Sequence, residues 1–268
     1  MRLYDQHTHS RNSHESGTIS SVEELCRSGM EAGLSGIVVT DHYDIRRRPR
    51  EVVTEQLRDS VEEILQTRER LDDRFYLGLG IELGEGHHDR SESAAAVALG
   101  DFDLVLGSLH NLRDMRDFYY IGKDRIDKRG LFRQYLAEQM EMLHWGGYDV
   151  LAHLTYPFRY YMLGVDTPDI REFEEELRVL FTRMAEQGKG LEVNTSGLCR
   201  PEHGRTMPEL WELRLFRACG GEIVTVGSDA HDHHHVGNGI AAGTELLREA
   251  GFCYQALYRQ RKPDMIPI

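Results

Sequence analysis

Histidine and carboxylate side chains recur where short apolar runs of the sequence end. The first run leads into His7 and His9, and two residues at i and i+2 on extended backbone point to the same side of a strand. These two imidazoles can therefore share one metal ion. Similar polar groups end the later runs: Thr40-Asp41-His42, Glu82, Ser108-Leu109-His110, His153, Glu192-Val193-Asn194 and Ser228-Asp229-Ala230-His231. Imidazole and carboxylate together suit Zn, Fe or Mn, whereas an all-oxygen set would indicate Ca or Mg.

Each of these side chains has an ordinary structural interpretation when it is considered alone. A single residue such as His110, His153 or Glu82 at the end of an apolar run is usually capped or hydrogen-bonded. Their joint occurrence is different, because burying several ionisable groups at one end of a domain without cations would cost on the order of several kcal/mol per group. The combination therefore predicts metal coordination.

The other histidines carry weaker signals. His14 lies in the loop after the first run, close enough in sequence to join the site. His87 and His88 lie in a loop rich in Gly, Glu and Asp, and His144 lies in a helical stretch, so solvated or packed roles are expected for these three. Of the run 231–235, only His231 belongs to the strand-end pattern.

The elements that must position these groups alternate along the chain. The predicted strands are 3–7, 36–41, 75–83, 102–110, 150–154, 190–194 and 222–228. The predicted helices between and after them are 21–33, 52–71, 93–100, 131–145, 170–188, 207–220 and 239–251. Because no Gly/Ser or Pro-rich linker divides the chain, one domain over 1–268 is expected.

This alternation predicts a parallel sheet with right-handed crossovers, either a closed (β/α) barrel or an open doubly wound sheet. No GxGxxG motif follows the first predicted strand. In a barrel, the chemistry gathers at the C-terminal ends of several strands, which is where the polar groups of this sequence fall. The barrel is therefore favoured.

Composition limits the partners. The 268 residues include 14 histidines, and 32 basic residues against 45 acidic ones give a formal charge of −13. This charge repels nucleic acid, membrane surfaces and phosphorylated ligands, so an anionic substrate would need a local cationic device. No long apolar run and no signal-peptide core are present, and the four cysteines are scattered. A cytoplasmic protein without nucleic-acid or membrane partners is expected, and its oligomeric state stays open.

The order of the motifs resembles a known family. DxHxH, TDH, an isolated Glu, SxH, an isolated His and GSDAH follow one another along essentially the whole chain. This combination is similar to the PHP (polymerase and histidinol phosphatase) superfamily, and within it to the monofunctional histidinol-phosphate phosphatases. The resemblance implies an α/β fold, a distorted (β/α)7 TIM-like barrel in a single domain, with two to three divalent transition-metal ions (Zn, Fe or Mn).

The resemblance also implies how the ligands are shared. The first metal would be held by His7, His9, Glu82 and Asp229, the second by Glu82, His110 and His153, and the third by His14, His42 and His231. Glu82 would then bridge two ions. The candidate catalytic groups are Glu82, Asp229, His231 and Asp41, and the leaving alkoxide would take its proton from a metal-bound water or from Asp41.

In this branch of the family, two loop arginines bind the substrate phosphate. Arg159 in TYPFRYY matches the first of them. The second is displaced by one position, because the usual NTSGLR reads NTSGLCR here and ends at Arg200. Either the loop adjusts so that Arg200 reaches the phosphate, or the anion clamp is weakened and the substrate is a different one.

The implied activity is hydrolysis of a small phosphorylated substrate, L-histidinol phosphate, to L-histidinol and phosphate by a metal-bridging hydroxide. One alternative is a phosphoesterase of the same superfamily acting on phosphotyrosine or on a small phosphodiester. Another is a non-catalytic metal-binding accessory domain, which the full ligand set and the acidic, free-standing chain oppose.

Overall fold

The computed structural model describes residues 2–13, 18–45, 48–121, 126–160, 166–199 and 204–268 of the chain. Its strands are β1 (Tyr4–Thr8), β2 (Gly36–Val39), β3 (His42–Asp44), β4 (Tyr76–Gly84), β5 (Leu104–Ser108), β6 (Val150–Leu151), β7 (Gly190–Asn194), β8 (Val224–Gly227), β9 (Tyr254–Arg259) and β10 (Lys262–Pro267). Each of the seven predicted strands overlaps one of these, and β3, β9 and β10 were not predicted.

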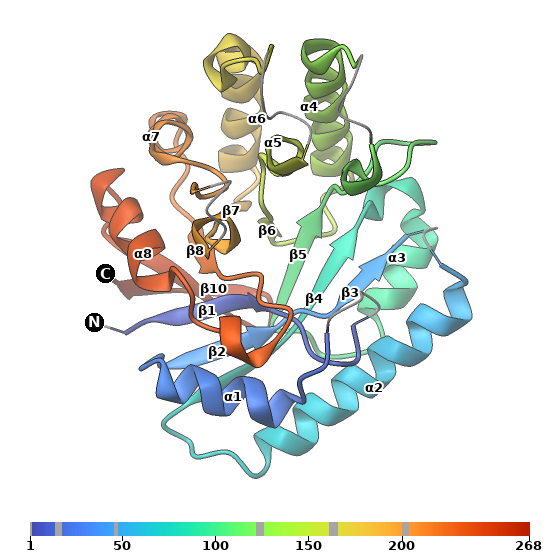
Figure 1. The fold of residues 1–268 in the computed structure, drawn as a ribbon, viewed down its shortest axis with the longest axis vertical. Coiled ribbons are helices and arrows are strands. Elements are labelled where there is room, and N and C mark those ends of the chain that lie inside the picture. Colours follow the sequence, from blue (N-terminus) through green and yellow to red (C-terminus); the bar gives the residue numbers. More distant parts are fainter. Residues whose placement is uncertain (1, 14–17, 46–47, 122–125, 161–165, 200–203) are drawn as a thin grey trace.

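The first eight strands pair in parallel in the order β1-β2-β4-β5-β6-β7-β8, and β3 also pairs with β4. Since β2 and β3 follow one another along the same neighbour, they occupy one strand position that is interrupted at Thr40 and Asp41. The ring closes at its C-terminal end, where a parallel bridge joins Thr8 to Ala230 and His9 N donates to Ala230 O over 2.8 Å. The predicted distorted (β/α)7 barrel is confirmed (Figure 1).

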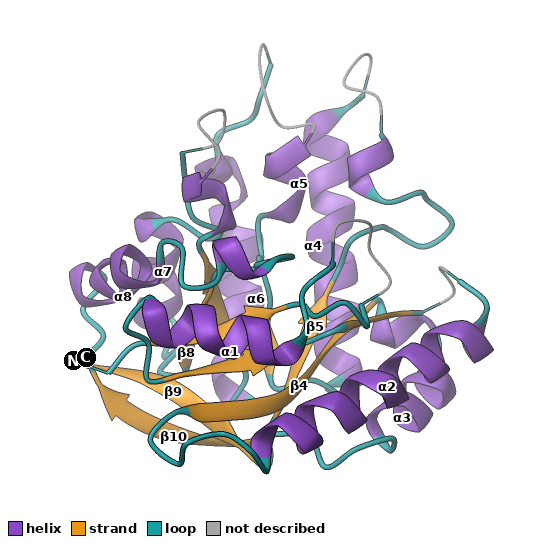
Figure 2. Cartoon of the chain, turned by 60° about the horizontal axis from the view of Figure 1, so that its bottom comes forward, coloured by secondary structure: helices purple, strands orange, loops and turns teal. Residues whose placement is uncertain are grey.

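Helices surround the strands (Figure 2). They are α1 (Val22–Glu31), α2 (Arg50–Arg68), α3 (Arg90–Val97), α4 (Lys128–Trp145), α5 (Tyr156–Tyr160), α6 (Glu174–Glu186), α7 (Leu210–Ala218) and α8 (Ile240–Glu249). Short 3-10 turns lie at η1 (Gly86–His88), η2 (Phe118–Tyr120), η3 (Ile170–Phe173), η4 (Ser196–Cys199) and η5 (His233–His235). Within the described ranges, no helix combines the length and the apolar character that a membrane span requires.

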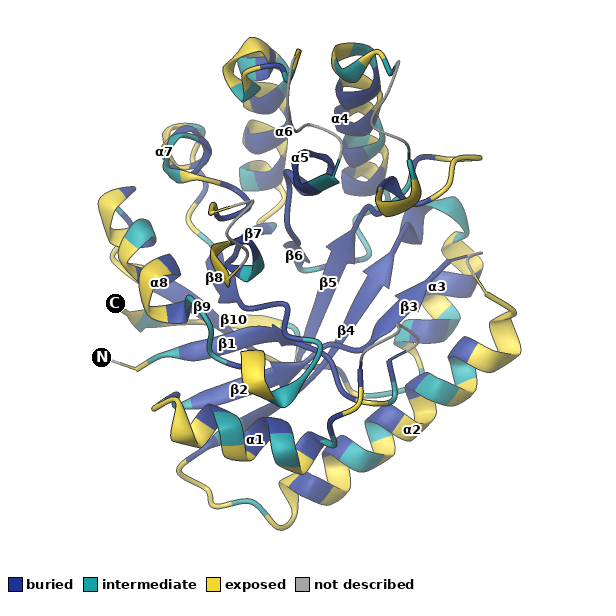
Figure 3. Cartoon of the chain, viewed as in Figure 1, coloured by how far each residue is buried: buried dark blue, intermediate teal, exposed yellow. Residues whose placement is uncertain are grey.

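The helices follow from local sequence signals. In α1, Ser21 and Glu24 form a capping box that satisfies backbone N–H groups of the first turn. In α6, the predicted apolar stripe is buried, while the opposite face carries charged side chains such as Glu174 and Arg178. Figure 3 shows the same division around the barrel, with buried strands and helices exposed on their outer faces.

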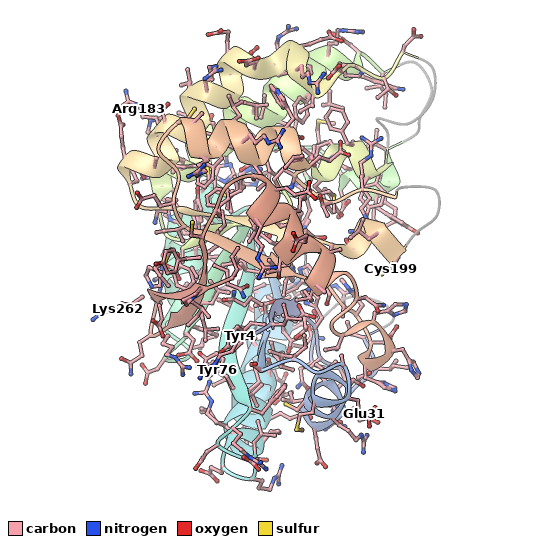
Figure 4. All side chains as sticks on the ribbon, turned by 90° about the vertical axis from the view of Figure 1, so that its left-hand side faces the viewer. Tyr4, Glu31, Tyr76, Arg183, Cys199 and Lys262 are labelled. Carbon is pink, nitrogen blue, oxygen red and sulfur yellow. The ribbon has the colours of Figure 1, made fainter. Side chains whose placement is uncertain are left out.

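A hairpin of β9 and β10 covers the N-terminal end of the barrel, and the sequence analysis did not predict it. Ala256 and Tyr258 pack with the barrel-lining residues Val38, Leu104, Leu106, Val150 and Ala152. The Gln6 side chain joins barrel and hairpin, since its Nε2 donates to Ala256 O over 2.6 Å. Figure 4 shows Tyr76 of β4 and Lys262 of β10 at this end of the molecule.

Asp5 holds the seam between β1 and β8. Its buried carboxylate accepts hydrogen bonds from Ser228 N (2.8 Å), Ser228 Oγ (2.5 Å) and Gly237 N (2.9 Å). Burial outweighs these hydrogen bonds and raises the pKa of Asp5 to about 6. The first acid of the DxHxH motif is therefore a structural tie in this chain.

Glu212, in the first turn of α7, is a second buried acid. Glu212 is only 2% exposed, and its Oε2 has no hydrogen-bond partner. Burial raises the pKa of Glu212 from its ordinary 4.5 to about 7, and nearby Glu209 adds to the effect.

We expect Glu212→Gln to remove part of the pH dependence of folding. The carboxyl ionises near pH 4.5 in the unfolded chain but keeps its proton to about pH 7 when folded, so stability falls as pH rises between these values. The shift corresponds to at most about 3 kcal/mol at alkaline pH, and glutamine avoids this loss. Urea unfolding at pH 5 and pH 8 measures it, with the exposed Glu175→Gln as control. The same pH dependence in Glu212→Gln and wild type would contradict the expectation.

Candidate metal centre

The carboxylate of Glu82 lies at the middle of the C-terminal end of the barrel. It is fully buried, and Ser108 Oγ donates to its Oε1 over 2.5 Å. Five imidazole nitrogens lie near its two oxygens: His153 Nε2 (2.8 Å), His7 Nε2 (3.1 Å), His110 Nε2 (3.2 Å), His42 Nδ1 (3.2 Å) and His9 Nε2 (3.4 Å). The structure thus brings together strand-end residues from β1, β3, β4, β5 and β6.

The first implied ligand set consists of Glu82, two of these histidines (His7 and His9) and Asp229. His7 Nε2 and His9 Nε2 lie 3.1 and 3.4 Å from Glu82 Oε2, and 3.7 and 3.4 Å from Asp229 Oδ1. Ligand atoms bound at about 2.0 Å to a tetrahedral zinc are about 3.3 Å apart. His7, His9 and Glu82 therefore form a group whose ligand atoms lie within 4.8 Å of one another, and Asp229 lies beside both histidines.

The second implied set shares Glu82 with the first, and two residues of the third set lie beside His9 of the first. The other oxygen of Glu82, Oε1, faces His110 Nε2 and His153 Nε2, so the carboxylate can bridge two ions. His42 and His231 lie near His9, and these three histidines each offer a nitrogen within 4.8 Å of the others. The implied third ligand of that set, His14, lies outside the described residues.

Unusual backbone geometry positions several candidate ligands. His153 and Asp229 adopt positive φ values of 28° and 55°, which are uncommon for non-glycine residues and are found in strained segments of functional sites as well as in turns. Gly227, at the end of β8, lies so close to its neighbours that an added Cβ would collide with His7 Cβ and Glu192 Oε1. A glycine is therefore required where β8 approaches the first ligand.

A further carboxylate that the sequence analysis did not select orients His7. Glu192 Oε1 accepts a hydrogen bond from His7 Nδ1 over 2.6 Å, which leaves the Nε2 lone pair for a metal. Its Oε2 accepts from His153 N over 2.9 Å, so one carboxylate fixes two candidate ligands. Its only sequence signal was a glutamate at a strand end.

Asp44 and Glu85 were also missed. Asp44 Oδ1 lies 3.5 Å from both His42 Nδ1 and His110 Nδ1, and Glu85 accepts from His110 N over 2.6 Å. With His110 they form a group whose ligand atoms lie within 4.8 Å of one another. Asp44 follows His42 by two residues on extended backbone, and that spacing is the signal that could have found it.

The histidines of this pocket have strongly perturbed pKa values. Burial outweighs the other contributions to the pKa of His9 and lowers it to about 3, and neither ring nitrogen of His9 has a hydrogen-bond partner. Burial would lower the pKa of His7 as well, but the carboxylates of Glu192, Glu82 and Asp229 raise it well above its usual range. A cation among these groups would satisfy the acids and the unpaired imidazole together, so the residues fit a metal centre.

Of the two arginines expected to bind phosphate, Arg159 lies among the described residues. Arg159, on α5, is 8% exposed and its Nη1 lies 3.2 Å from Asp229 Oδ2, so it contacts a candidate metal ligand as well as the edge of the site. Its Nε has no hydrogen-bond partner. Arg200 lies outside the described residues.

Asp41 has contacts that the sequence analysis did not anticipate. Its oxygens accept hydrogen bonds from Ser10 N (2.6 Å), Ser10 Oγ (2.6 Å) and Ser60 Oγ (2.5 Å). Burial raises its pKa. The carboxyl thus ties the segment after β1 to α2.

Aromatic residues of α5 border the metal centre. The Tyr156 ring lies 5.0 Å from the rings of both His110 and His153, measured between centroids. Phe158 instead packs against Phe132 at 4.9 Å, which is core packing. Tyr160 contacts Tyr156 at 5.0 Å.

Comparison of the chain with known proteins identifies a matching family model and similar proteins. The family model described as PHP domain matches residues 5–196. The chain is 30% identical to a protein of Deinococcus radiodurans named "Probable histidinol-phosphatase", over 93% of this chain and 94% of that protein. It is 27% identical to a Lactococcus lactis protein named "Histidinol-phosphatase", over 98% of this chain and 97% of that protein.

A solved structure has the same fold. It is histidinol phosphate phosphatase from Lactococcus lactis, in complex with Zn, L-histidinol and phosphate. The two chains are 24% identical, their TM-score is 0.83, and the match covers 98% of this chain and 99% of that one.

We expect Glu192→Gln to weaken metal binding without unfolding the protein. The amide can accept from only one of His7 Nδ1 and His153 N, so His7 loses its fixed orientation and affinity should fall about 10- to 100-fold. Zinc titration of chelator-treated protein measures this, with the exposed Glu222→Gln as control. Unchanged affinity in Glu192→Gln would show that Glu192 does not orient a ligand.

Proposed function

The chain belongs to the PHP domain family, and on that premise we propose that it is a metal-dependent phosphomonoesterase that hydrolyses L-histidinol phosphate to L-histidinol and phosphate. The observation that carries the proposal is the convergence of five imidazoles on the buried carboxylate of Glu82. The choice of substrate is supported by relatives named histidinol-phosphatase, which align with this chain over nearly their whole length. Residues 1–268 are proposed as one PHP unit.

The proposed cofactor is two to three divalent transition-metal ions (Zn, Fe or Mn). The first would be held by His7, His9, Glu82 and Asp229, the second by Glu82, His110 and His153, and the third by His14, His42 and His231. Zinc in the structurally similar phosphatase and the donor set of imidazole and carboxylate support this assignment. When bound, such ions neutralise phosphate charge and make a hydroxide nucleophile available near neutral pH.

The chain's own residues would do the remaining work. Glu82 holds two ligand sets at a fixed separation because each of its oxygens faces a different group of imidazoles. Arg159 is proposed to bind a non-bridging phosphate oxygen, since its guanidinium is buried at the site and its Nε has no partner. Asp229 contacts both the first ligand set and the phosphate-binding arginine. Its Oδ1 lies toward His7 and His9, and its Oδ2 lies toward Arg159.

The source of the leaving-group proton follows from the contacts of Asp41. To donate a proton, this carboxyl would have to give up hydrogen bonds from Ser10 and Ser60 that tie the segment after β1 to α2. We therefore assign Asp41 a positioning role and leave proton donation to water in the site. His231, whose side chain is 28% exposed, is the catalytic candidate with access to solvent.

The imidazole of the substrate needs a surface to contact. Tyr160 and Tyr119 lie 5.5 Å apart, Tyr119 is 63% exposed, and the guanidinium of Arg159 lies 5.6 Å from the Tyr160 ring. We propose that these tyrosines receive the imidazole while Arg159 holds the phosphate. The proposed location is the cytoplasm, with which four unpaired cysteines agree.

The substrate is tested by steady-state kinetics on L-histidinol phosphate, simple alkyl phosphates, phosphotyrosine and bis-nitrophenyl phosphate. We expect kcat/KM for L-histidinol phosphate to exceed that for alkyl phosphates about 100-fold or more, because the amine and imidazole add contacts in the transition state. Equal values would indicate a generic phosphoesterase, and a preference for phosphotyrosine or the diester would indicate a different specificity. No hydrolysis by metal-loaded protein would indicate an accessory domain.

Arg159→Met tests the phosphate contact. Loss of a charge-assisted bond to the phosphate should lower kcat/KM by about one to two orders of magnitude. Arg183→Met, on the exposed face of α6, is the control and should behave as wild type (Figure 4). Metal content is measured in parallel, because Arg159 also contacts Asp229. An equal loss of metal and activity would mean that Arg159 acts through Asp229 and does not bind phosphate.

A further inference from the structure

A second group of metal-ligating side chains lies outside the Glu82 centre. His87 and His88 belong to η1, the turn after β4, and Glu138 belongs to α4. His88 Nε2 lies 3.0 Å and His87 Nε2 lies 3.4 Å from the same oxygen, Glu138 Oε2. The two imidazole rings lie 4.3 Å apart at an interplanar angle of 63°.

Neither solvation nor packing, the roles expected from the sequence, accounts for His87. This residue is 7% exposed, and neither of its ring nitrogens has a hydrogen-bond partner. Buried polar groups are normally paired, so an imidazole with two unpaired nitrogens beside a carboxylate requires an explanation. Of the two histidines, His88 makes a hydrogen bond to that carboxylate and His87 does not.

The charges favour a cation at this place. His87 is buried with both ring nitrogens unpaired, and its Nε2 lies 3.4 Å from the carboxylate of Glu138. Burial alone would raise the pKa of Glu138, but contacts from His87, His88 and the Arg113 backbone outweigh it and hold the value at about 2. The guanidinium of Arg113 lies toward Glu141, 3.7 Å away, and only its backbone N–H contacts Glu138, at 2.8 Å.

The geometry matches one ion. Two imidazole nitrogens and a carboxylate oxygen, with two separations of 3.0 and 3.4 Å, reproduce the spacing of about 3.3 Å expected around tetrahedral zinc. We propose that His87, His88 and Glu138 form a separate, mononuclear site for a divalent transition metal of the zinc type. Water would complete its coordination, and it shares no residue with the Glu82 centre.

The site would join η1, α4 and the loop after β5, and that loop also carries His110 of the Glu82 centre. Glu138 Oε1 accepts from Arg113 N, in the loop after β5, and the same loop carries His110 and Asn111, whose N–H groups both donate to Glu85. An ion here would brace η1 and this loop against α4. His88 also lines a cavity of about 530 Å³ with Asn111, Arg113 and Tyr120, which gives an ion a route from solvent.

The test is the zinc stoichiometry of the full-length protein. Chelator-treated wild type, His88→Ala and Glu138→Gln are titrated with Zn²⁺ by calorimetry, and bound metal is counted by elemental analysis. Each variant should bind one equivalent fewer than wild type, and the double variant should also lose one equivalent and not two, because both residues serve one ion. Glu141→Gln, three residues along α4 and 60% exposed, is the matched control and should bind as wild type.

Activity does not serve as the readout, because none of these residues is placed in the catalytic machinery. Wild-type stoichiometry in folded Glu138→Gln or His88→Ala would overturn the proposal. If the variants do not fold, the wild-type chain still decides it, through modification by diethyl pyrocarbonate mapped by mass spectrometry. Zn²⁺ should protect the peptide that carries His87 and His88 at least tenfold, and unchanged reactivity would overturn the proposal.

Discussion

A carboxylate with no access to water, Glu82, lies within 3.4 Å of a ring nitrogen from each of five histidines. A buried anion is costly unless opposite charge and hydrogen bonds surround it, and here one hydroxyl, from Ser108, adds to the imidazoles. Asp229 adds a second buried carboxylate beside His7 and His9, and the formal charge of the whole chain is −13. The carboxylate and its neighbours therefore require cations, and this requirement explains why the strands deliver imidazole at one end of the barrel.

The distortions of the barrel follow from this requirement. A regular ring would continue each strand, but β6 has only two residues before His153 turns at φ 28°, and Asp229 turns at φ 55° directly after Ser228. Such conformations cost on the order of 1 to 3 kcal/mol each and persist where the surroundings impose them. Glu192 is one such constraint, because it holds both the ring of His7 and the backbone of His153.

The sequence predicted that the strand-end side chains meet, because their period and position carried that signal. His7 and His9 share a strand face, and Glu82, His110 and His153 end apolar runs, so their meeting follows from the parallel barrel. The sequence did not distinguish the two glutamates that end strands. Glu82 is a candidate metal ligand and Glu192 orients two candidate ligands, but both have the same local sequence pattern. That distinction depends on which ring nitrogen each oxygen faces, and no spacing in the chain encodes it.

The hairpin of β9 and β10 was missed for a different reason. Its turn residues, Gln260 and Arg261, have φ values of 49° and 61° without a glycine, so the usual turn signal is absent. Tertiary contacts stabilise it instead, because Arg261 Nη2 lies 2.8 Å from Asp149 Oδ1 and Arg261 N donates to Asp103 O. Pro263 in β10 is compatible with an edge strand, but it lowered the strand signal further.

The ring closure between β1 and β8 has a consequence for biosynthesis. Gln6 and Ala256 are 250 positions apart, and His7 and Asp229 are brought together only when β8 exists. At translation rates of about 5 to 20 residues per second, the nascent N-terminal strand waits roughly 10 s or more for its partner. Contacts of such long range also slow folding, since loop-closure entropy is lost before they form. The ligand sets that include Asp229 and His231 are thus completed only after β8 has been synthesised, and until then the edge of β1 that β8 will cover is open to association with other chains.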